Sequence, residues 1–288
     1  MGRQRALELI DAVSELSVCF VGDAIIDEYR YCQPLNKSPK ENLIPVRWHS
    51  TDEFHGGVEA AANHARTFCR AVDIMSKGLA TRKVRFLEQP YNRKVFEYQC
   101  VAESVSLDPG SLLGYDMVVV TDFGHGELMK HARQHLCEWV PKLAVNTQTN
   151  AANYGFNPIT NYRRADYIVI DEPEARLSAH DRDSPIEEVI ERLADGRCKK
   201  FIVTRGTEGA IGYDGKRFVK QRAFTKTVID TMGAGDAFFA VTAPMSQVGE
   251  LEELLLIGNA AGALKCGILG HREPVTKQHV VEFLRSHV

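Results

Sequence analysis

The stretch Ile229–Thr242 reads IDTMGAGDAFFAVT and is the most informative run in the chain. Its Gly233-Ala234-Gly235 segment carries almost no side-chain bulk, so the backbone N–H groups can converge on an anion without steric cost. The apolar residues after Asp236 predict a buried helix, which places those N–H groups at the positive end of a helix dipole. Asp236 falls in the first turn of that helix, where a carboxylate is favoured. The run therefore predicts an anion cradle with an ionised carboxylate beside it.

This pair of features is what phosphoryl transfer to an alcohol requires. The N–H groups of Gly233, Ala234 and Gly235 would hold the charge that develops on the transferred group, and Asp236 would take the hydroxyl proton. A plain strand-to-helix turn capped by Asp236 is the alternative, since short glycine motifs match often by accident. The full string D-T-x-G-A-G-D-A-F is more specific and resembles the C-terminal signature of the ribokinase-like (PfkB) carbohydrate kinases. The resemblance implies a sugar kinase with Asp236 as its base.

Length and composition are those of one large α/β domain, expected to span residues 1–288. The formal net charge of −3 lacks the excess of basic residues that is typical of nucleic-acid-binding proteins. The N-terminal residues are unlike a secretory signal, and no apolar run approaches the roughly 20 residues of a membrane span. The seven cysteines include no CxxC pair, which favours reduced thiols over a disulfide framework or a zinc site. We therefore expect a cytoplasmic protein that binds neither nucleic acid nor membrane.

Polar residues follow the first predicted strand, Leu16–Val21. Open α/β sheets bind ligands beyond the carboxyl ends of their strands, so Asp23 and Asp27 are candidates to accept hydrogen bonds from sugar hydroxyls. A simple turn or capping role is the alternative for Asp23. Residues 29–54 then alternate in short, aromatic-rich pieces between prolines, which predicts a small β lid. Residues 83–101 read as a hairpin that joins the lid, and a homodimer formed through it is a further expectation.

These N-terminal segments resemble the heptose 7-phosphate kinases of the ADP-heptose pathway. The chain has their GDxxxDxY string after the first strand, an SP-containing flap, and a helix opened by Gly56-Gly57, where backbone can approach a ligand. Many relatives read GGAAN; here Ala60 occupies the Asn place, and Asn63 is the candidate to replace it. The resemblance implies transfer to C1 of a heptose 7-phosphate. A kinase for a fructose- or ribose-type sugar, and a binding or regulatory homologue, remain alternatives.

Candidate contacts for a substrate phosphate lie on the 83–101 hairpin. We assign Arg93 to the substrate site, with Arg82, Arg85 and Lys94 as further candidates. The alternative is that these charges only alternate along a solvent-exposed hairpin and bind no ligand. The buried strand Met117–Thr121 ends in DFGHG, which looks like the DYGKG turn of the heptose kinases with His125 in place of Lys. Asp122 in this turn is expected at the same sheet edge as Asp23 and is also assigned to the substrate site.

Metal contacts are implied by the same resemblance. After strand Tyr167–Ile170, Asp171 and Glu174 occupy the family's NxxE pattern, which helps organise Mg²⁺ and its waters. Mg²⁺ prefers oxygen ligands, so a carboxylate in the Asn place is chemically tolerable. An ordinary acidic pair at a helix N-terminus is the alternative. Asp230 is expected to shape the motif loop or to touch the metal or a monovalent cation.

The nucleotide side is assigned from the turn after strand Lys199–Thr204, which resembles the family's VTxGxxG turn. Thr204, Gly206 and Gly209 are expected to line it, and Asn259 to lie near the adenine. Strands and helices alternate along the chain, which predicts a ribokinase-like α/β fold with a mostly parallel sheet, helices on both faces and the β lid. ATP and Mg²⁺ are the expected cofactors, and a sugar or sugar phosphate is the expected partner. The chain lacks GxxxxGK[ST], so a P-loop kinase is excluded.

Overall fold

A computed structural model describes residues 2–76, 80–89, 91, 93–101, 109–126, 128–224 and 228–287. The helices are α1 (Gly2–Ala12), α2 (Gly57–Ala65), α3 (Lys130–Trp139), α4 (Glu172–Ala179), α5 (Ile186–Ala194), α6 (Ala234–Thr242), α7 (Leu251–Cys266) and α8 (Lys277–His287). The strands are β1 (Ser17–Gly22), β2 (Ala24–Pro34), β3 (Val46–Gly56), β4 (Ala71–Met75), β5 (Thr81–Glu88), β6 (Arg93–Cys100), β7 (Met117–Asp122), β8 (Leu143–Thr147), β9 (Tyr167–Asp171), β10 (Lys200–Thr204), β11 (Ala210–Tyr213) and β12 (Phe218–Gln221).

The main sheet has the strand order β12-β11-β10-β9-β8-β7-β1-β4. From β10 to β4 every neighbouring pair is parallel, and β11 and β12 complete one edge as an antiparallel pair. The predicted apolar runs become central strands because both faces of a parallel sheet are covered by helices. In β7, for example, all six residues are buried. The expected mostly parallel α/β architecture is confirmed.

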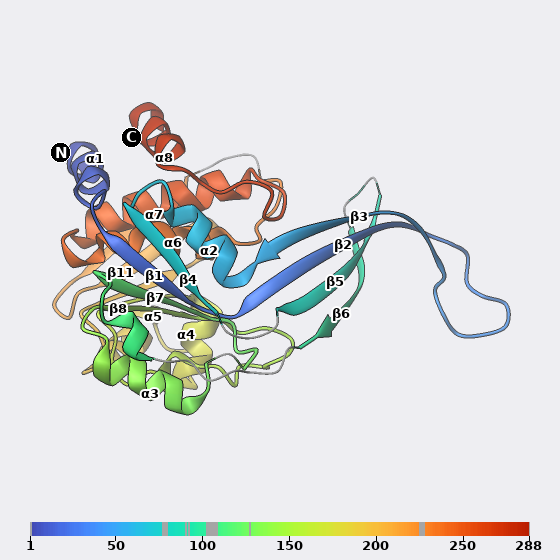
Figure 1. The fold of residues 1–288 in the computed structure, drawn as a ribbon, viewed down its shortest axis with the longest axis horizontal. Helices are drawn as coiled ribbons and strands as arrows, with labels where there is room; N and C mark the ends of the chain where they lie inside the picture. The colour runs from blue at the N-terminus through green and yellow to red at the C-terminus, as the bar shows by residue number, and fades with distance from the viewer. Residues whose placement is uncertain are drawn as a thin grey trace.

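Alternate side chains of the central strands point to opposite faces of the sheet and pack into two separate hydrophobic cores. Phe20 and Val119 belong to the cluster beneath α1, α2, α6, α7 and α8, whereas Val21 and Val120 belong to the cluster beneath α3, α4 and α5. Figure 1 shows these two helical layers on opposite faces of the sheet. Because all the parallel strands share one direction, their carboxyl ends meet along one edge, and the following turns gather there.

A second sheet, with the order β3-β2-β5-β6, projects from that region (Figure 1). Its strands β2 and β5 are parallel, and the outer pairs are antiparallel. Its strands begin earlier than the predicted lid, since β2 starts at Ala24, directly after β1, and β5 starts at Thr81. The unusually short connection noted near residues 75–80 lies partly outside the described residues.

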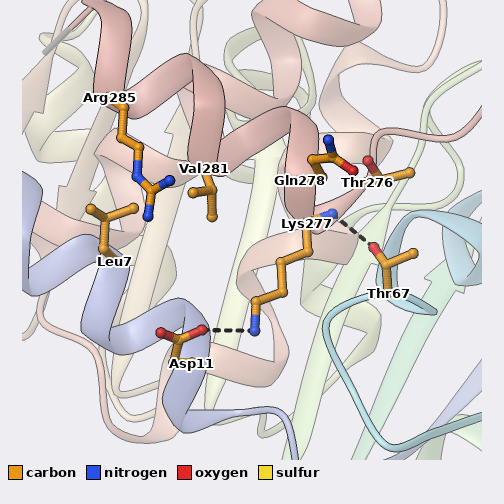
Figure 2. A pocket seen from close by; sticks show the side chains of 8 residues that line it. All are labelled: Leu7, Asp11, Thr67, Thr276, Lys277, Gln278, Val281 and Arg285. Atoms are coloured by element: carbon orange, nitrogen blue, oxygen red, sulfur yellow. Dashed lines mark hydrogen bonds and ion pairs between the residues drawn. The ribbon is translucent and has the colours of Figure 1, made fainter.

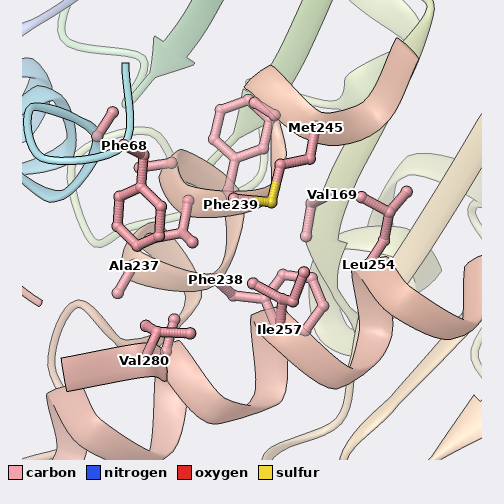
Figure 3. Close-up of a cluster of buried hydrophobic side chains, with 14 of the residues drawn as sticks. Phe68, Val169, Ala237, Phe238, Phe239, Met245, Leu254, Ile257 and Val280 are labelled. Carbon is pink, nitrogen blue, oxygen red and sulfur yellow. The ribbon is translucent and has the colours of Figure 1, made fainter. Parts of the chain in front are cut away.

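Helix α6 is anchored near this edge by buried side chains. Ala237, Phe238 and Phe239 are buried in the core shown in Figure 3, where they lie beside residues of α7 and α8. The Thr242 hydroxyl at the other end of the helix lies 2.8 Å from the Tyr167 hydroxyl of β9. These contacts fix the direction of α6, so its first turn is presented rigidly at the sheet edge.

Within the described residues, no helix combines the length and the apolar character needed to cross a membrane.

A buried histidine makes stability depend on pH. His64 of α2 is 2% exposed, and its Nδ1 accepts a hydrogen bond of 2.8 Å from the Val275 amide. Burial, followed by the charges of Lys265 and His271, lowers the pKa of His64 to about 3. His64 therefore binds a proton below about pH 6.5 in the unfolded chain but stays neutral in the folded chain until the pH approaches 3. The free energy of unfolding therefore decreases as the pH falls below 6.5.

We expect this loss to approach about 1.4 kcal/mol per pH unit for the one proton. The measurement is urea unfolding at pH 7.5 and pH 5.0 for the wild type and for His64→Gln, whose side-chain oxygen can still accept from Val275. The variant should lose less stability than the wild type on acidification. Identical losses in the two proteins would contradict the assignment to His64.

Candidate active site

The carboxyl edge of the main sheet, the base of the lid and the start of α6 enclose a cavity of about 300 Å³. Gln148, Asp171 and Thr204 line it from the turns and ends of β8, β9 and β10. These residues are far apart in sequence, and the parallel strand order brings them together. The cavity therefore sits where an open α/β sheet binds its ligands.

The glycine motif forms one wall of this cavity. Gly233 lies at φ = 75°, the left-handed region that other residues rarely adopt, and α6 begins directly after it. The amides of Gly233, Gly235 and Asp236 donate no hydrogen bond to any other group in the described part of the chain, although all three residues line the cavity. The Ala234 amide, also predicted to join the cradle, instead donates to the Thr231 carbonyl at 3.4 Å, and Ala234 is not among the lining residues. Free amides at the start of a helix are a ready-made anion site.

The Asp236 carboxylate lies beside these amides. Its Oδ1 accepts a hydrogen bond from Nε2 of Gln148, which orients the carboxylate within the cavity. Burial raises the pKa of Asp236, and the positive charges of His271, Lys265 and Lys83 oppose that rise. A carboxylate whose pKa moves toward neutrality becomes a better acceptor for a hydroxyl proton.

The lid contributes two cations to the opposite wall. Lys83 and Arg85 are 8% and 7% exposed and project from the same side of β5, two residues apart. The Arg85 guanidinium is paired with Asp27 and with Glu97. The Lys83 ammonium has no hydrogen bond or ion pair to a described residue, and burial lowers its pKa. An unpaired, desolvated ammonium facing a cavity is a receptor for an anionic ligand group.

Asp27 lines the cavity next to these cations. It receives the Arg85 ion pair, and its Oδ2 lies 3.5 Å from Nε2 of His271. Burial alone would raise the pKa of Asp27, but the hydrogen bond from His271 and the charge of Arg85 hold it below its usual value. At Gly56 a side-chain Cβ would come within 2.5 Å of this carboxylate, so glycine leaves room for Asp27.

Comparison with known proteins identifies the family. The family model of the pfkB family carbohydrate kinases matches residues 128–278, just over half of the chain. The chain belongs to the pfkB carbohydrate kinase family.

Individual relatives are more distant. The chain is 30% identical over 159 residues to the probable chloroplastic fructokinase-6 of Arabidopsis thaliana, a match that covers 51% of this chain but only 41% of that protein. Among solved structures, the ribokinase of Thermotoga maritima superposes with a TM-score of 0.74 at 15% identity over 94% of this chain and all of its own. The ribokinase of Arabidopsis thaliana complexed with ribose and ATP gives 0.73 at 15% identity, over 94% and 99%. These structures establish the ribokinase-like fold.

Two predicted substrate residues of this pfkB-family protein serve its internal structure instead. The Asp23 carboxylate accepts hydrogen bonds from the amides of Phe123 (2.9 Å) and His125 (3.4 Å). The Asp122 carboxylate accepts from the Tyr162 hydroxyl at 2.7 Å and from the Arg133 side chain at 2.9 Å. Both carboxylates lie outside the cavity lining and tie the turn after β7 to its neighbours.

Two other predicted substrate contacts also lie elsewhere. Asn63 faces along α2, where its side-chain oxygen accepts from Arg66 at 2.9 Å. Arg93 is 71% exposed at the start of β6 and pairs with Glu88. Of the two glycines predicted at the substrate site, Gly57 lines the cavity and Gly56 does not, and their contact with substrate stays a prediction.

The predicted metal residues fall into two groups. Asp171 and Glu174 line the cavity and also form a capping box, with each side chain accepting the other's backbone N–H at the start of α4. Burial and the neighbouring Asp171 raise the pKa of Glu174. Asp230 lies outside the lining, and its carboxylate accepts from the amides of Met232 and Gly270, both at 3.0 Å. Asp230 therefore shapes the motif loop, one of the two roles expected for it.

The predicted nucleotide residues are more peripheral. Thr204 lines the cavity, whereas Gly206 and Gly209 lie in the turn just beyond it. Asn259 is buried in α7 and approaches the Gln221 carbonyl at 3.4 Å. Thr204 ends β10 and Asn259 lies near Gln221, the last residue of β12. The assignment of these residues to the nucleotide remains a prediction.

A larger hollow of about 580 Å³ lies between α1 and α8 (Figure 2), and none of the motif residues lines it. Lys277 crosses it, with its ammonium 2.8 Å from Asp11 and its amide 2.8 Å from the Thr67 hydroxyl. It contains neither the glycine motif nor a carboxyl end of the sheet. We therefore place the candidate active site in the smaller cavity.

Sequence reasoning missed several residues that matter at this site, namely Lys83, Gln148, His271 and Lys265. The bond from Gln148 to Asp236 depends on a contact across 88 residues, which no local pattern indicates. For Lys265 a signal was present, because it is a lone lysine near the end of the otherwise apolar part of α7. A charged residue in such a run is costly to bury unless it has a specific partner.

Proposed function

We propose that the chain is an ATP-dependent carbohydrate kinase whose acceptor sugar carries an anionic group. The observation that carries this proposal is that the free amides of Gly233 and Gly235, the Asp236 carboxylate and the Lys83 ammonium line one cavity. The transferred phosphoryl group needs charge stabilisation, the attacking hydroxyl needs a base, and an anionic substituent needs a cation. Each need has a matching group, and family membership supports the reaction class.

In the proposed reaction the sugar hydroxyl lies against Asp236, with Gln148 fixing the carboxylate. The hydroxyl proton passes to Asp236 while the hydroxyl oxygen forms a bond to the γ-phosphorus and the bond to the β-phosphate oxygen breaks. The amides of Gly233 and Gly235 stabilise the charge on the transferring group, and ADP leaves. The protein contributes positioning and electrostatics, which are the main requirements of phosphoryl transfer.

Mg²⁺ would enter with the nucleotide. Within the described residues no group of three or more His, Cys, Asp or Glu side chains could hold an ion. The pair Asp171 and Glu174 offers carboxylate oxygens on the cavity, which suits an ion that keeps most of its waters and binds substrate phosphates. When bound there, Mg²⁺ would neutralise charge on the β- and γ-phosphates.

The more specific proposal for the acceptor is C1 of a heptose 7-phosphate. Lys83 and Arg85 support a phosphorylated sugar, because they place positive charge inside the cavity. Two of the predicted candidates, Arg93 and Lys94, do not, because they are exposed and outside the cavity lining, as is Lys37 of the SP-containing flap. Their positions favour a second candidate, a kinase for a fructose- or ribose-type sugar.

A coupled ADP-release assay across a panel of sugars and sugar phosphates separates these candidates. The panel includes heptose 7-phosphate, fructose 6-phosphate, ribose 5-phosphate and the unphosphorylated sugars. We expect the highest kcat/KM with a phosphorylated sugar, and phosphorus NMR of the product locates the new ester. Absence of ADP release with every sugar would refute the kinase proposal.

The proposal includes a homodimer formed through the lid. Trp48 of β3 and Phe96 of β6 are each 60% exposed on the lid sheet. Large aromatic side chains exposed on one small sheet are typical of a protein–protein contact surface. Light scattering coupled to gel filtration tests the assembly state, and Trp48→Lys should favour the monomer.

The two glycines of the motif are predicted to respond differently to alanine. Gly233→Ala places a side chain at positive φ and should cost about 1–2 kcal/mol of stability. At Gly235 an added Cβ meets no atom within 4 Å, so stability should be kept. That methyl group would nevertheless enter the space of the transferring phosphate, and we expect kcat/KM to fall by at least about tenfold. Thermal unfolding and the ADP assay measure both effects, and a fully active Gly235→Ala enzyme would contradict the cradle.

A further inference from the structure

Lys265, in the last turn of α7, has no solvent exposure. Its ammonium donates hydrogen bonds to the carbonyl oxygens of Met232 at 2.9 Å and Gly270 at 2.7 Å. Met232 directly precedes Gly233, and Gly270 directly precedes the cavity residue His271. One buried charge therefore joins the loop before α6 to the loop after α7.

The same two loops are joined a second time by Asp230. Its carboxylate accepts from the amides of Met232 and Gly270, while Lys265 binds the carbonyls of the same two residues. The Asp230 and Asp236 carboxylates favour the charged form of Lys265, against the burial that lowers its pKa. Two carbonyls with a nearby carboxylate form an oxygen-rich site of the kind that hard cations occupy. In this chain an ammonium fills it.

Peptide geometry links this site to the cradle. The carbonyl of Met232 and the N–H of Gly233 belong to one planar trans peptide, so they point in opposite directions. When the ammonium holds the Met232 carbonyl on one side, the Gly233 N–H is turned to the other side, where Gly233 lines the cavity. The Lys265 side chain also lies close to Gly233, because its Cε would be 3.3 Å from a Cβ built at that position.

We propose that Lys265 is a positioning residue for phosphoryl transfer: its ammonium acts as a built-in cation that aims the cradle amides, so that catalysis needs no added monovalent cation. The inference rests on the proposed kinase function. A methionine of similar length would fill the same space but would leave the Met232 and Gly270 carbonyls without this donor, so kinetic readouts are needed to separate positioning from stability.

The test compares Lys265→Ala and Lys265→Met with the wild type in the ADP assay. We expect kcat to fall at least about thirtyfold in both variants, with the KM for ATP and for sugar changing less than about threefold. Methylammonium or potassium should restore kcat at least about tenfold in Lys265→Ala, which has space for the ion, and not in Lys265→Met. The wild-type rate should not depend on either ion.

Lys200→Ala is the matched control. Lys200 also donates to two backbone carbonyls, those of Ser246 and Gly249, both at 2.7 Å, but it lies away from the cavity. Its removal should leave kcat unchanged and create no cation dependence. The proposal is overturned by an unchanged kcat in Lys265→Met, by a folded Lys265→Ala enzyme that no cation rescues, or by a wild type that requires potassium. If Lys265→Ala does not fold, the kcat of Lys265→Met alone decides.

Failure of the kinase proposal itself would be seen separately, as absence of activity in the wild type with every sugar. In that case amide hydrogen exchange still tests Lys265. Exchange at residues 229–236 should accelerate in Lys265→Met but not in Lys200→Ala. Equal exchange in both variants would overturn the positioning role.

Discussion

The Asp236→Asn enzyme is expected to lose at least about a thousandfold in kcat while it still binds ATP and sugar within a few-fold of the wild type. The amide is nearly isosteric and can still bond to Gln148, but it cannot take up the hydroxyl proton. General-base catalysis typically contributes about 10²–10⁴-fold, so loss of the proton acceptor accounts for an effect of this size. Single-turnover kinetics and calorimetric titration separate the chemical step from binding.

Glu252→Gln is the matched control for this variant. Glu252 also lies in the first turn of a helix, α7, so both substitutions remove a charge that favours the helix dipole. Its carboxylate is solvent-accessible and paired with Arg217, remote from the cavity. The control should retain wild-type kcat. Near-normal turnover in Asp236→Asn would remove Asp236 from the role of base.

The Lys83→Met enzyme is expected to lose at least about thirtyfold in kcat/KM for its phosphorylated acceptor and less than threefold for the neutral sugar of the same skeleton. Lys83 lines the cavity, is 8% exposed and has no partner among the described residues, so a bound anion would form a largely desolvated charge pair with it. Truncating one partner of such a pair typically costs about 2–5 kcal/mol. Methionine keeps the length of the side chain and removes only the charge.

Lys94→Met tests whether any cation of the lid would give the same effect. Lys94 pairs in register with Leu87 on the neighbouring strand but is exposed and outside the cavity. Its substitution should change neither kinetic constant. Equal losses with neutral and phosphorylated acceptors in Lys83→Met would place the ammonium on the nucleotide instead, and would contradict the anionic-acceptor proposal.

Local sequence patterns were sufficient for the central strands of the main sheet and for the local backbone geometry of the glycine motif. Continuous apolar runs such as Met117–Thr121 have the length and composition of strands covered on both faces, and they occupy the centre of the sheet. The motif at residues 233–236 carries its own geometry, because glycine is needed at positive φ and the apolar residues after it must be buried. These features depend on neighbours in the sequence.

The missed residues depend on pairing between distant segments. Lys83 pairs in register with Asp27 across the parallel contact of β5 with β2, and that register decides which side chains of the lid face the cavity. The hairpin pattern alone could not distinguish Arg85, which faces inward, from Arg93, which is exposed. In the same way, Asp23 and Asp122 stand at the expected edge, but buried amides and side chains of neighbouring turns satisfy their carboxylates.

A crystal structure with ADP, aluminium fluoride and the best acceptor sugar tests the central claim most directly. The account predicts that the planar aluminium fluoride, which mimics the phosphoryl group in the transition state, accepts hydrogen bonds from the amides of Gly233 and Gly235. It also predicts that one sugar hydroxyl lies within hydrogen-bonding distance of Asp236. A fluoride bound away from these amides, or a sugar hydroxyl that contacts a different base, would contradict the account.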